Sequence, residues 1–208
     1  MQATVPSSDL SLSTFAGCKA RQERLQSILE QHGLEGLLIS NPTDICYLTS
    51  FHGDESLAVV TGSGAWVVSD SRFEDELASF DREATGAGVI MGIRHKLNDA
   101  IRDHLKSLGV RRLGVQAEVM PVAEMDAIKA ELEPSGLEIV PIANVVPDMR
   151  RIKDESEIAL ICHAINIQQQ ALTEALDGLQ IGMTEHAFAA NLEYAMRRLG
   201  ASDRGFPL

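Results

Sequence analysis

Three consecutive aliphatic residues at positions 37–39 (Leu-Leu-Ile) constrain the fold of this chain more than any other feature. A short, continuous apolar run is typical of a strand that is buried on both faces of a sheet. The preceding segment, residues 19–32, has apolar residues at helical spacing and ends at Gly33, where a helix commonly stops. Because a sheet buried on both faces needs helices on both sides, these two segments indicate an α/β architecture.

The same alternation continues along the chain. Strand patterns lie at residues 57–60, 65–68, 89–91, 112–115 and 137–142, and helix patterns lie at residues 71–77, 97–108 and 121–132. Residues 61–64 (Thr-Gly-Ser-Gly) join the first two of these strands as a hairpin, whereas residues 41–44 (Asn-Pro-Thr-Asp) are predicted to form a turn. In the last helix, Val122 and Ile128 are expected to face the core. The predicted fold class is therefore α/β, with a mixed β-sheet flanked by helices.

The pattern changes near residue 147, where Pro147 and Asp148 interrupt the strands. A long helix is predicted after Lys153, with acidic residues in its first turns that complement the helix dipole. Thr184 then caps a second helix, which ends at Gly200. The apolar faces of these two helices consist of Ile158, Ile161, Ile165, Leu172 and Leu176 in the first, and Phe188, Leu192, Met196 and Leu199 in the second. We expect a flexible leader over residues 1–14, one domain over 15–147 and the start of another over 148–208.

Composition excludes several classes of function. The net charge is −12 and no run of Lys and Arg occurs, so the chain is not expected to bind nucleic acid. The three cysteines are widely spaced, which fits a reducing cytoplasm better than a disulfide framework or a zinc knuckle. The first 14 residues lack the features of a signal peptide, and no apolar run approaches the roughly 18 residues that span a bilayer. These features predict a cytoplasmic protein with no membrane partner.

Three short motifs occur in order along the chain. They are residues 47–51 (Tyr-Leu-Thr-Ser-Phe), residues 69–73 (Ser-Asp-Ser-Arg-Phe) and residues 150–153 (Arg-Arg-Ile-Lys) followed by Glu-Ile at 157–158. Together they resemble the creatinase/prolidase family, whose members often have Tyr-Leu-Thr-Gly-Phe, Thr-Asp-x-Arg-Tyr and Arg-x-Ile-Lys-x-x-x-Glu-Ile at these places. Ser50 and Phe73 depart from the common glycine and tyrosine. Residues 182–185 and 200–201 continue the resemblance, which extends over roughly residues 19–206.

The resemblance implies a creatinase-type N-terminal α/β domain followed by the first two helices of a truncated pita-bread domain. In its full-length form such a protein is a metal-dependent Xaa-Pro aminopeptidase or dipeptidase, which hydrolyses the bond before proline in a peptide substrate and forms a homodimer. Two divalent metal ions (Mn, Co or Zn), held by two Asp, one His and two Glu, carry the chemistry. By resemblance all five ligands lie beyond Leu208. We therefore assign no catalytic, cofactor-binding or metal-binding residue in this chain and expect it to be inactive alone.

Simpler structural roles account for the individual residues. Tyr47 and Phe51 are expected to pack in the core, Asp70 and Arg72 to cap a helix and pair, and residues 150–153 to form a domain hinge. His52 with Asp54 and Glu55 is the best candidate ligand group, and it has the composition of an ordinary polar loop. Cys162 and His163 are adjacent on a helix and so do not face each other.

Two other functions stay open at the level of the sequence. One is a non-catalytic dimerisation or regulatory module, with the two C-terminal helices as its partner surface. The other is a fragment of a creatinase-like amidinohydrolase. Because the apolar helix faces need a cover, residues 154–208 are expected to dock loosely, to pair as a helical hairpin or to be buried against a partner.

Overall fold

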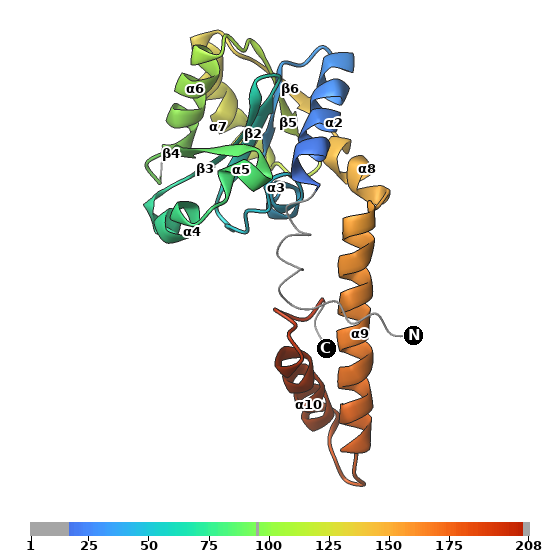
Figure 1. Ribbon diagram of the computed structural model, residues 1–208. Coiled ribbons are helices and arrows are strands. Elements are labelled where there is room, and N and C mark those ends of the chain that lie inside the picture. The colour runs from blue at the N-terminus through green and yellow to red at the C-terminus, as the bar shows by residue number, and fades with distance from the viewer. Residues whose placement is uncertain (1–16, 95, 206–208) are drawn as a thin grey trace. The chain divides into compact units, whose positions relative to one another are not determined.

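The computed structural model describes residues 17–94 and 96–205, and these divide into two compact units between Ile152 and Lys153 (Figure 1). The predicted leader over residues 1–14 lies outside the described residues. Each unit is described by itself below.

The first unit contains a six-stranded sheet with the strand order β4-β3-β2-β1-β5-β6. Its strands are β1 (Gly36–Ile39), β2 (Leu57–Thr61), β3 (Gly64–Ser69), β4 (Ala87–Met91), β5 (Arg112–Gln116) and β6 (Glu138–Ile142). β2 is antiparallel to both β1 and β3, whereas the pairs β1–β5, β5–β6 and β3–β4 are parallel. The sheet is therefore mixed, as predicted, and the hairpin of β2 and β3 is confirmed.

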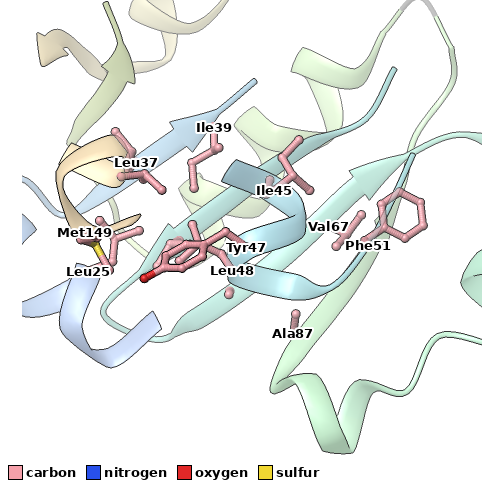
Figure 2. Packing of buried hydrophobic residues seen from close by; sticks show 14 of the residues in the cluster. Leu25, Leu37, Ile39, Ile45, Tyr47, Leu48, Phe51, Val67, Ala87 and Met149 are labelled. Atoms are coloured by element: carbon pink, nitrogen blue, oxygen red, sulfur yellow. The ribbon is translucent and has the colours of Figure 1, made fainter. Parts of the chain in front are cut away.

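Helices cover both faces of this sheet. One face packs against α2 (Cys18–Gln31), α3 (Pro42–Thr49) and α8 (Val145–Arg151), and the other packs against α6 (Leu97–Ser107) and α7 (Val122–Leu132). Leu37 and Ile39 point into the first cluster and Leu38 into the second, which explains why β1 is an unbroken apolar run. Figure 2 shows the first cluster, where Leu25 of α2 and Met149 of α8 lie close to Leu37. Short helices η1 (Ser71–Phe73), α4 (Glu74–Ala78), α5 (Arg82–Thr85) and η2 (Glu133–Ser135) complete the unit.

The predicted turn at residues 41–44 is wrong, because the chain enters α3 there. Asn41 is the N-cap of this helix, and its side chain accepts a hydrogen bond from the backbone N–H of Thr43 at 2.9 Å. Pro42 occupies the first turn, where its missing N–H costs nothing. Ser50 ends the helix with a left-handed backbone, φ 58°. Glycine adopts this conformation without steric cost, which gives a physical reason for the glycine that the family commonly has there.

The strand pattern stops before Pro147, as expected, because residues 145–151 form the helix α8, with Pro147 in its first turn, where proline is tolerated. Arg150 lies in this helix, and the division between the two units falls between Ile152 and Lys153, inside the segment predicted to be a hinge. One further expectation is wrong in the first unit. Val122 is 78% exposed at the start of α7, whereas Ile128 is buried as expected. The first residue of a helix can project beyond the edge of the surface on which later turns pack.

The second unit is a hairpin of α9 (Glu155–Asp177) and α10 (Glu185–Arg198), which pack against each other. Both predicted helix starts are confirmed. Asp154 and Glu157 form a capping box at α9, and the Thr184 hydroxyl accepts a hydrogen bond from the Ala187 N–H at α10. The pairing of the two helices is one of the three arrangements expected for this region. No helix among the described residues is long and apolar enough to cross a membrane.

Candidate functional site

A fully buried carboxylate, Asp44, is the centre of the most distinctive polar cluster in the first unit. It lies in the first turn of α3 and is 0% exposed. Its Oδ1 accepts a hydrogen bond from Nη1 of Arg150 at 2.8 Å, and its Oδ2 accepts one from Nε2 of Gln116 at 2.7 Å. An aspartate is almost never fully buried unless it is paired. The hydrogen bonds from Arg150 and Gln116 therefore compensate for the cost of burying the negative charge of Asp44 in the core.

Gln116 connects this carboxylate to the backbone. It is the last residue of β5 and is 2% exposed. Its Oε1 accepts hydrogen bonds from the backbone N–H groups of Ser40 at 3.0 Å and Asn41 at 3.1 Å, which follow β1. One amide side chain thus joins the carboxyl ends of the parallel strands β1 and β5 to the start of α3.

This cluster lies at a switch point of the sheet. β1 leads into α3 on one face, while the neighbouring strand β5 leads into α7 on the other face. In open α/β sheets, the carboxyl ends of two strands whose connections diverge in this way are a usual place for a functional site. Sequence reasoning did not single out Asp44 or Gln116. The available signal was an aspartate embedded among the apolar residues that follow residue 37.

Arg150 gives the cluster a side that faces solvent. Its side chain is 35% exposed, whereas that of Asp44 is 0% exposed. A guanidinium held by a buried carboxylate has few rotamers left, so the position of the Arg150 side chain is fixed. The same ion pair fastens α8 to α3 at the end of the first unit, immediately before the chain continues into α9.

A second polar cluster surrounds the start of η1. Arg72 donates from Nε to Oδ1 of Asp70 at 2.9 Å and from Nη2 to Oδ2 at 2.8 Å, and it also pairs with Glu55. The Asp70 Oδ1 caps the helix by accepting from the Arg72 N–H at 3.0 Å. Hydrogen bonds from Arg72 lower the pKa of Asp70 to about 2 and also lower the pKa of Glu55. The predicted cap and ion pair are confirmed.

The structure brings the first two sequence motifs into contact and places the third beside the helix that carries the first. Phe51 of the first motif makes an edge-to-face contact with Phe73 of the second, with ring centroids 6.0 Å apart. Arg150 of the third reaches Asp44, three residues before Tyr47. Tyr47 and Phe51 are 9% and 4% exposed, which confirms that they belong to the core. The motifs therefore share a structural function, which is to join α3, η1 and α8 to one face of the sheet.

The residues described do not fit the metal centre that the resemblance implies. Across residues 17–94 and 96–205, no group of three or more His, Cys, Asp or Glu side chains could hold a metal ion. His52 lies beside Cys46, with Nδ1 3.6 Å from the sulfur, and Glu55 pairs with Arg72. The candidate group of His52, Asp54 and Glu55 is thus not assembled as a ligand set.

The three cysteines differ in their surroundings. Cys18 is buried with its sulfur 3.3 Å from the Ser50 hydroxyl, Cys46 is partly buried, and Cys162 is exposed on α9. Burial raises the pKa of the Cys46 thiol. Reactivity toward thiol reagents should therefore be concentrated at Cys162.

The sequence matches the family described as Creatinase/Prolidase N-terminal domain over residues 21–152. It is 30% identical over 190 residues to the uncharacterized peptidase YqhT of Bacillus subtilis, which covers 89% of this chain and 51% of that protein. The structure is similar to an Xaa-Pro dipeptidase from Bacillus anthracis, with a TM-score of 0.79 and 25% identity over 91% of this chain and 51% of that one. It is also similar to an X-Pro aminopeptidase from Thermotoga maritima, with a TM-score of 0.76 and 26% identity over 88% of this chain and 50% of that one.

The chain spans about half the length of the curated relatives that it matches. The family match ends at residue 152, at the division between the two units, while a structural match over 91% of the chain must also include residues of α9, which is 23 residues long. The six strands of the mixed sheet and the first two motifs lie within the matched range, and the third motif begins at its end. The chain therefore belongs to the creatinase/prolidase family, and residues 21–152 are its N-terminal domain.

Proposed function

We propose that this chain is the N-terminal region of a metal-dependent Xaa-Pro peptidase that hydrolyses the bond before proline in peptides. The observation that carries the proposal is the structural match to an Xaa-Pro dipeptidase across 91% of this chain, because it continues past the N-terminal domain into α9. Fold similarity alone would support only the architecture. Similarity that extends into α9 supports the same order of domains along the chain.

In this proposal the chemistry belongs to a longer protein that holds two divalent ions, Mn, Co or Zn. The chain alone is proposed to be inactive, because its described residues contain no group that fits such a centre. No catalytic step is assigned to Asp44 or Arg150. Their proposed function is to hold α8 on α3, and so to fix the point at which the chain leaves the N-terminal domain.

The exposed apolar surface of the second unit supports the proposal that the chain is part of a longer protein. Ile158, Ile161 and Ile165 of α9 are 51%, 44% and 44% exposed. A hollow of about 530 Å³ lies along α9 and α10, lined by residues that include Ile161, Ile165 and Met196. Leaving large aliphatic side chains in water forfeits about 1.5–3 kcal/mol each. We propose that the remaining half of the protein covers this surface, since the relatives continue for as much chain again.

A second candidate function rests on the same surface. The chain could act as a non-catalytic dimerisation or regulatory module whose apolar hairpin binds a partner. A creatinase-like amidinohydrolase on the same scaffold is the third candidate, and its substrate would be creatine in place of a proline peptide. The three candidates predict different substrates and different sizes of the protein in the cell. The proposed protein is cytoplasmic and homodimeric.

Two measurements test the proposal. The first is the mass of the endogenous protein, which should exceed that of the 208-residue chain. The second is a chimera in which this chain replaces the N-terminal half of the Bacillus anthracis Xaa-Pro dipeptidase. With Mn²⁺, Co²⁺ or Zn²⁺ added, the chimera should hydrolyse Xaa-Pro dipeptides and not creatine, and the 208-residue chain alone should hydrolyse neither.

The controls separate the candidates. A folded chimera without peptidase activity, or an endogenous mass equal to that of the chain, would favour the binding module. Turnover of an Xaa-Pro peptide by the pure 208-residue chain, or tightly held stoichiometric metal in it, would overturn the proposal. Circular dichroism of the chimera distinguishes lost activity from lost folding.

A further inference from the structure

Three phenylalanine rings meet where the first two sequence motifs are in contact. Phe51, which follows α3, makes edge-to-face contacts with Phe73 of η1 and with Phe80 between α4 and α5, each with ring centroids 6.0 Å apart. Figure 2 shows Phe51 beside Val67 of β3. Phe51 is 4% exposed, whereas Phe73 and Phe80 are only partly buried. The aromatic cluster therefore extends from the core to the surface of the first unit.

A hollow of about 340 Å³ opens beside these rings, and all three rings line it together with Gly53, Glu76 and Asp81. Its volume lies in the range of about 300–1,000 Å³ that is usual for small-molecule sites. Gly53 passes directly over the cluster, because a Cβ on this residue would lie 2.3 Å from Cε1 of Phe51. The loop can lie this close to the ring only because position 53 has no side chain.

The carboxylates of Glu76 and Asp81 set the sign of the charge at this hollow. Both residues are exposed, and no lysine or arginine of the described part of the chain lines the hollow. The surrounding sequence has the same bias, because residues 50–83 contain eight Asp and Glu but only two Lys and Arg. The electrostatic potential at the hollow is therefore negative, and it favours a cation over an anion.

Arg72 does not reverse this sign. Its charge is balanced by ion pairs with Asp70 and Glu55. Its guanidinium carbon also lies over the ring of Phe73, 5.6 Å from the ring centroid, so one ring of the cluster already contacts a cation. An ammonium group is attracted both by the quadrupole of an aromatic ring and by a carboxylate. Rings and carboxylates in one hollow are therefore the combination that suits an apolar amine.

We propose that this hollow binds a small molecule that carries an ammonium group on an apolar body. The apolar body packs against Phe51, Phe73 and Phe80, and the ammonium group pairs with the carboxylates of Glu76 and Asp81. Because both carboxylates are exposed to solvent, the binding is weak, with a Kd on the order of 1 mM. The inference does not rest on peptidase activity, and its test uses the 208-residue chain directly.

Two matched ligands test the requirement for a positive charge. Phenethylammonium and phenylpropionate share an aromatic body and carry opposite charges at neutral pH. In NMR titrations of the nitrogen-labelled chain, phenethylammonium should shift the backbone amide signals of residues 50–53 and 79–81 until they saturate, and phenylpropionate should not. Equal shifts with both ligands would overturn the proposal. So would shifts confined to α9 and α10, or no saturable shift at the hollow.

Variants test the two halves of the proposed contact. Glu76→Gln should weaken the binding of phenethylammonium about two- to fivefold, which is the contribution of an exposed ion pair. Asp75→Asn is the matched control, because it removes an exposed charge from the same helix but does not line the hollow, so it should change the affinity much less. Phe80→Leu keeps an apolar side chain but removes a ring, and it should also weaken binding about two- to fivefold. Equal affinities of the Glu76 and Asp75 variants, in spectra that show both folded, would overturn the proposal.

Discussion

Removing the Arg150 side chain tests how much the first unit depends on its buried carboxylate. In Arg150→Met the apolar part of the side chain is retained, but Asp44 loses its countercharge while it remains 0% exposed. Breaking a buried ion pair from one side costs about 3–5 kcal/mol. The lower end applies here, because Gln116 still donates to the carboxylate and Arg150 is itself 35% exposed. We expect the free energy of unfolding to fall by about 3 kcal/mol.

Urea unfolding followed by tryptophan fluorescence measures the change in the free energy of unfolding of the first unit. Trp66 is the single tryptophan of the chain and lies in β3, so its signal reports the first unit. A loss of about 3 kcal/mol corresponds to a decrease in melting temperature of about 6–12 °C for a chain of this size. Arg151→Met is the matched control, since Arg151 pairs with Asp148 at a site where the side chains are 80% and 64% exposed. That control should lose less than about 1 kcal/mol.

A double-mutant cycle separates lost pairing from lost packing. Asp44→Asn removes the buried charge, so adding Arg150→Met to it should cost less than Arg150→Met costs alone. Strict additivity of the two changes, or a loss in Arg150→Met no greater than that in Arg151→Met, would refute the argument that the buried charge is what makes Arg150 necessary.

Three further results are expected. The pKa of Asp70 is about 2, below its unfolded value of about 3.9, so its pairing with Arg72 stabilises the fold above about pH 4 and this stabilisation is lost as the pH falls toward 2. Asp70→Asn should flatten this part of the stability–pH curve. An unchanged curve would contradict the role of the Asp70–Arg72 pair. Ser50→Val should be less stable than Ser50→Gly by about 1–2 kcal/mol in urea unfolding, because only glycine relieves the left-handed backbone; equal stabilities would refute the strain. In native protein Cys162 should react with Ellman's reagent well before Cys18, which is buried; equal rates would show that the α2 region opens readily.

The sheet and its flanking helices could be predicted because their signals are local. Each strand is a short apolar run bounded by turn residues, and helices such as α6 show a regular apolar face. The helix α3 could not be predicted from the sequence, and the reason is also local. Asn-Pro signals both a turn and the start of a helix, and an eight-residue helix is too short to show periodicity or to be stable without packing.

The polar cluster could not be predicted from local patterns. Arg150 and Asp44 are 106 positions apart, and Gln116 and Asp44 are 72 positions apart. Gln116 meets Asp44 because β5 enters the sheet beside β1, and Arg150 meets it because α8 packs against α3; neither contact can be seen in a sequence window. Pairing of Asp70 with Arg72 could be predicted because the two residues are two positions apart and share one cap.

The long separation between Asp44 and Arg150 also affects how the protein is made. During translation α3 is synthesised well before α8. The nascent chain therefore contains Asp44, which is buried in the folded domain, before Arg150 has been added. Docking of α3 onto the sheet at that stage would bury an uncompensated negative charge. We therefore expect α3 to dock stably on the sheet only after residue 150 has left the ribosome.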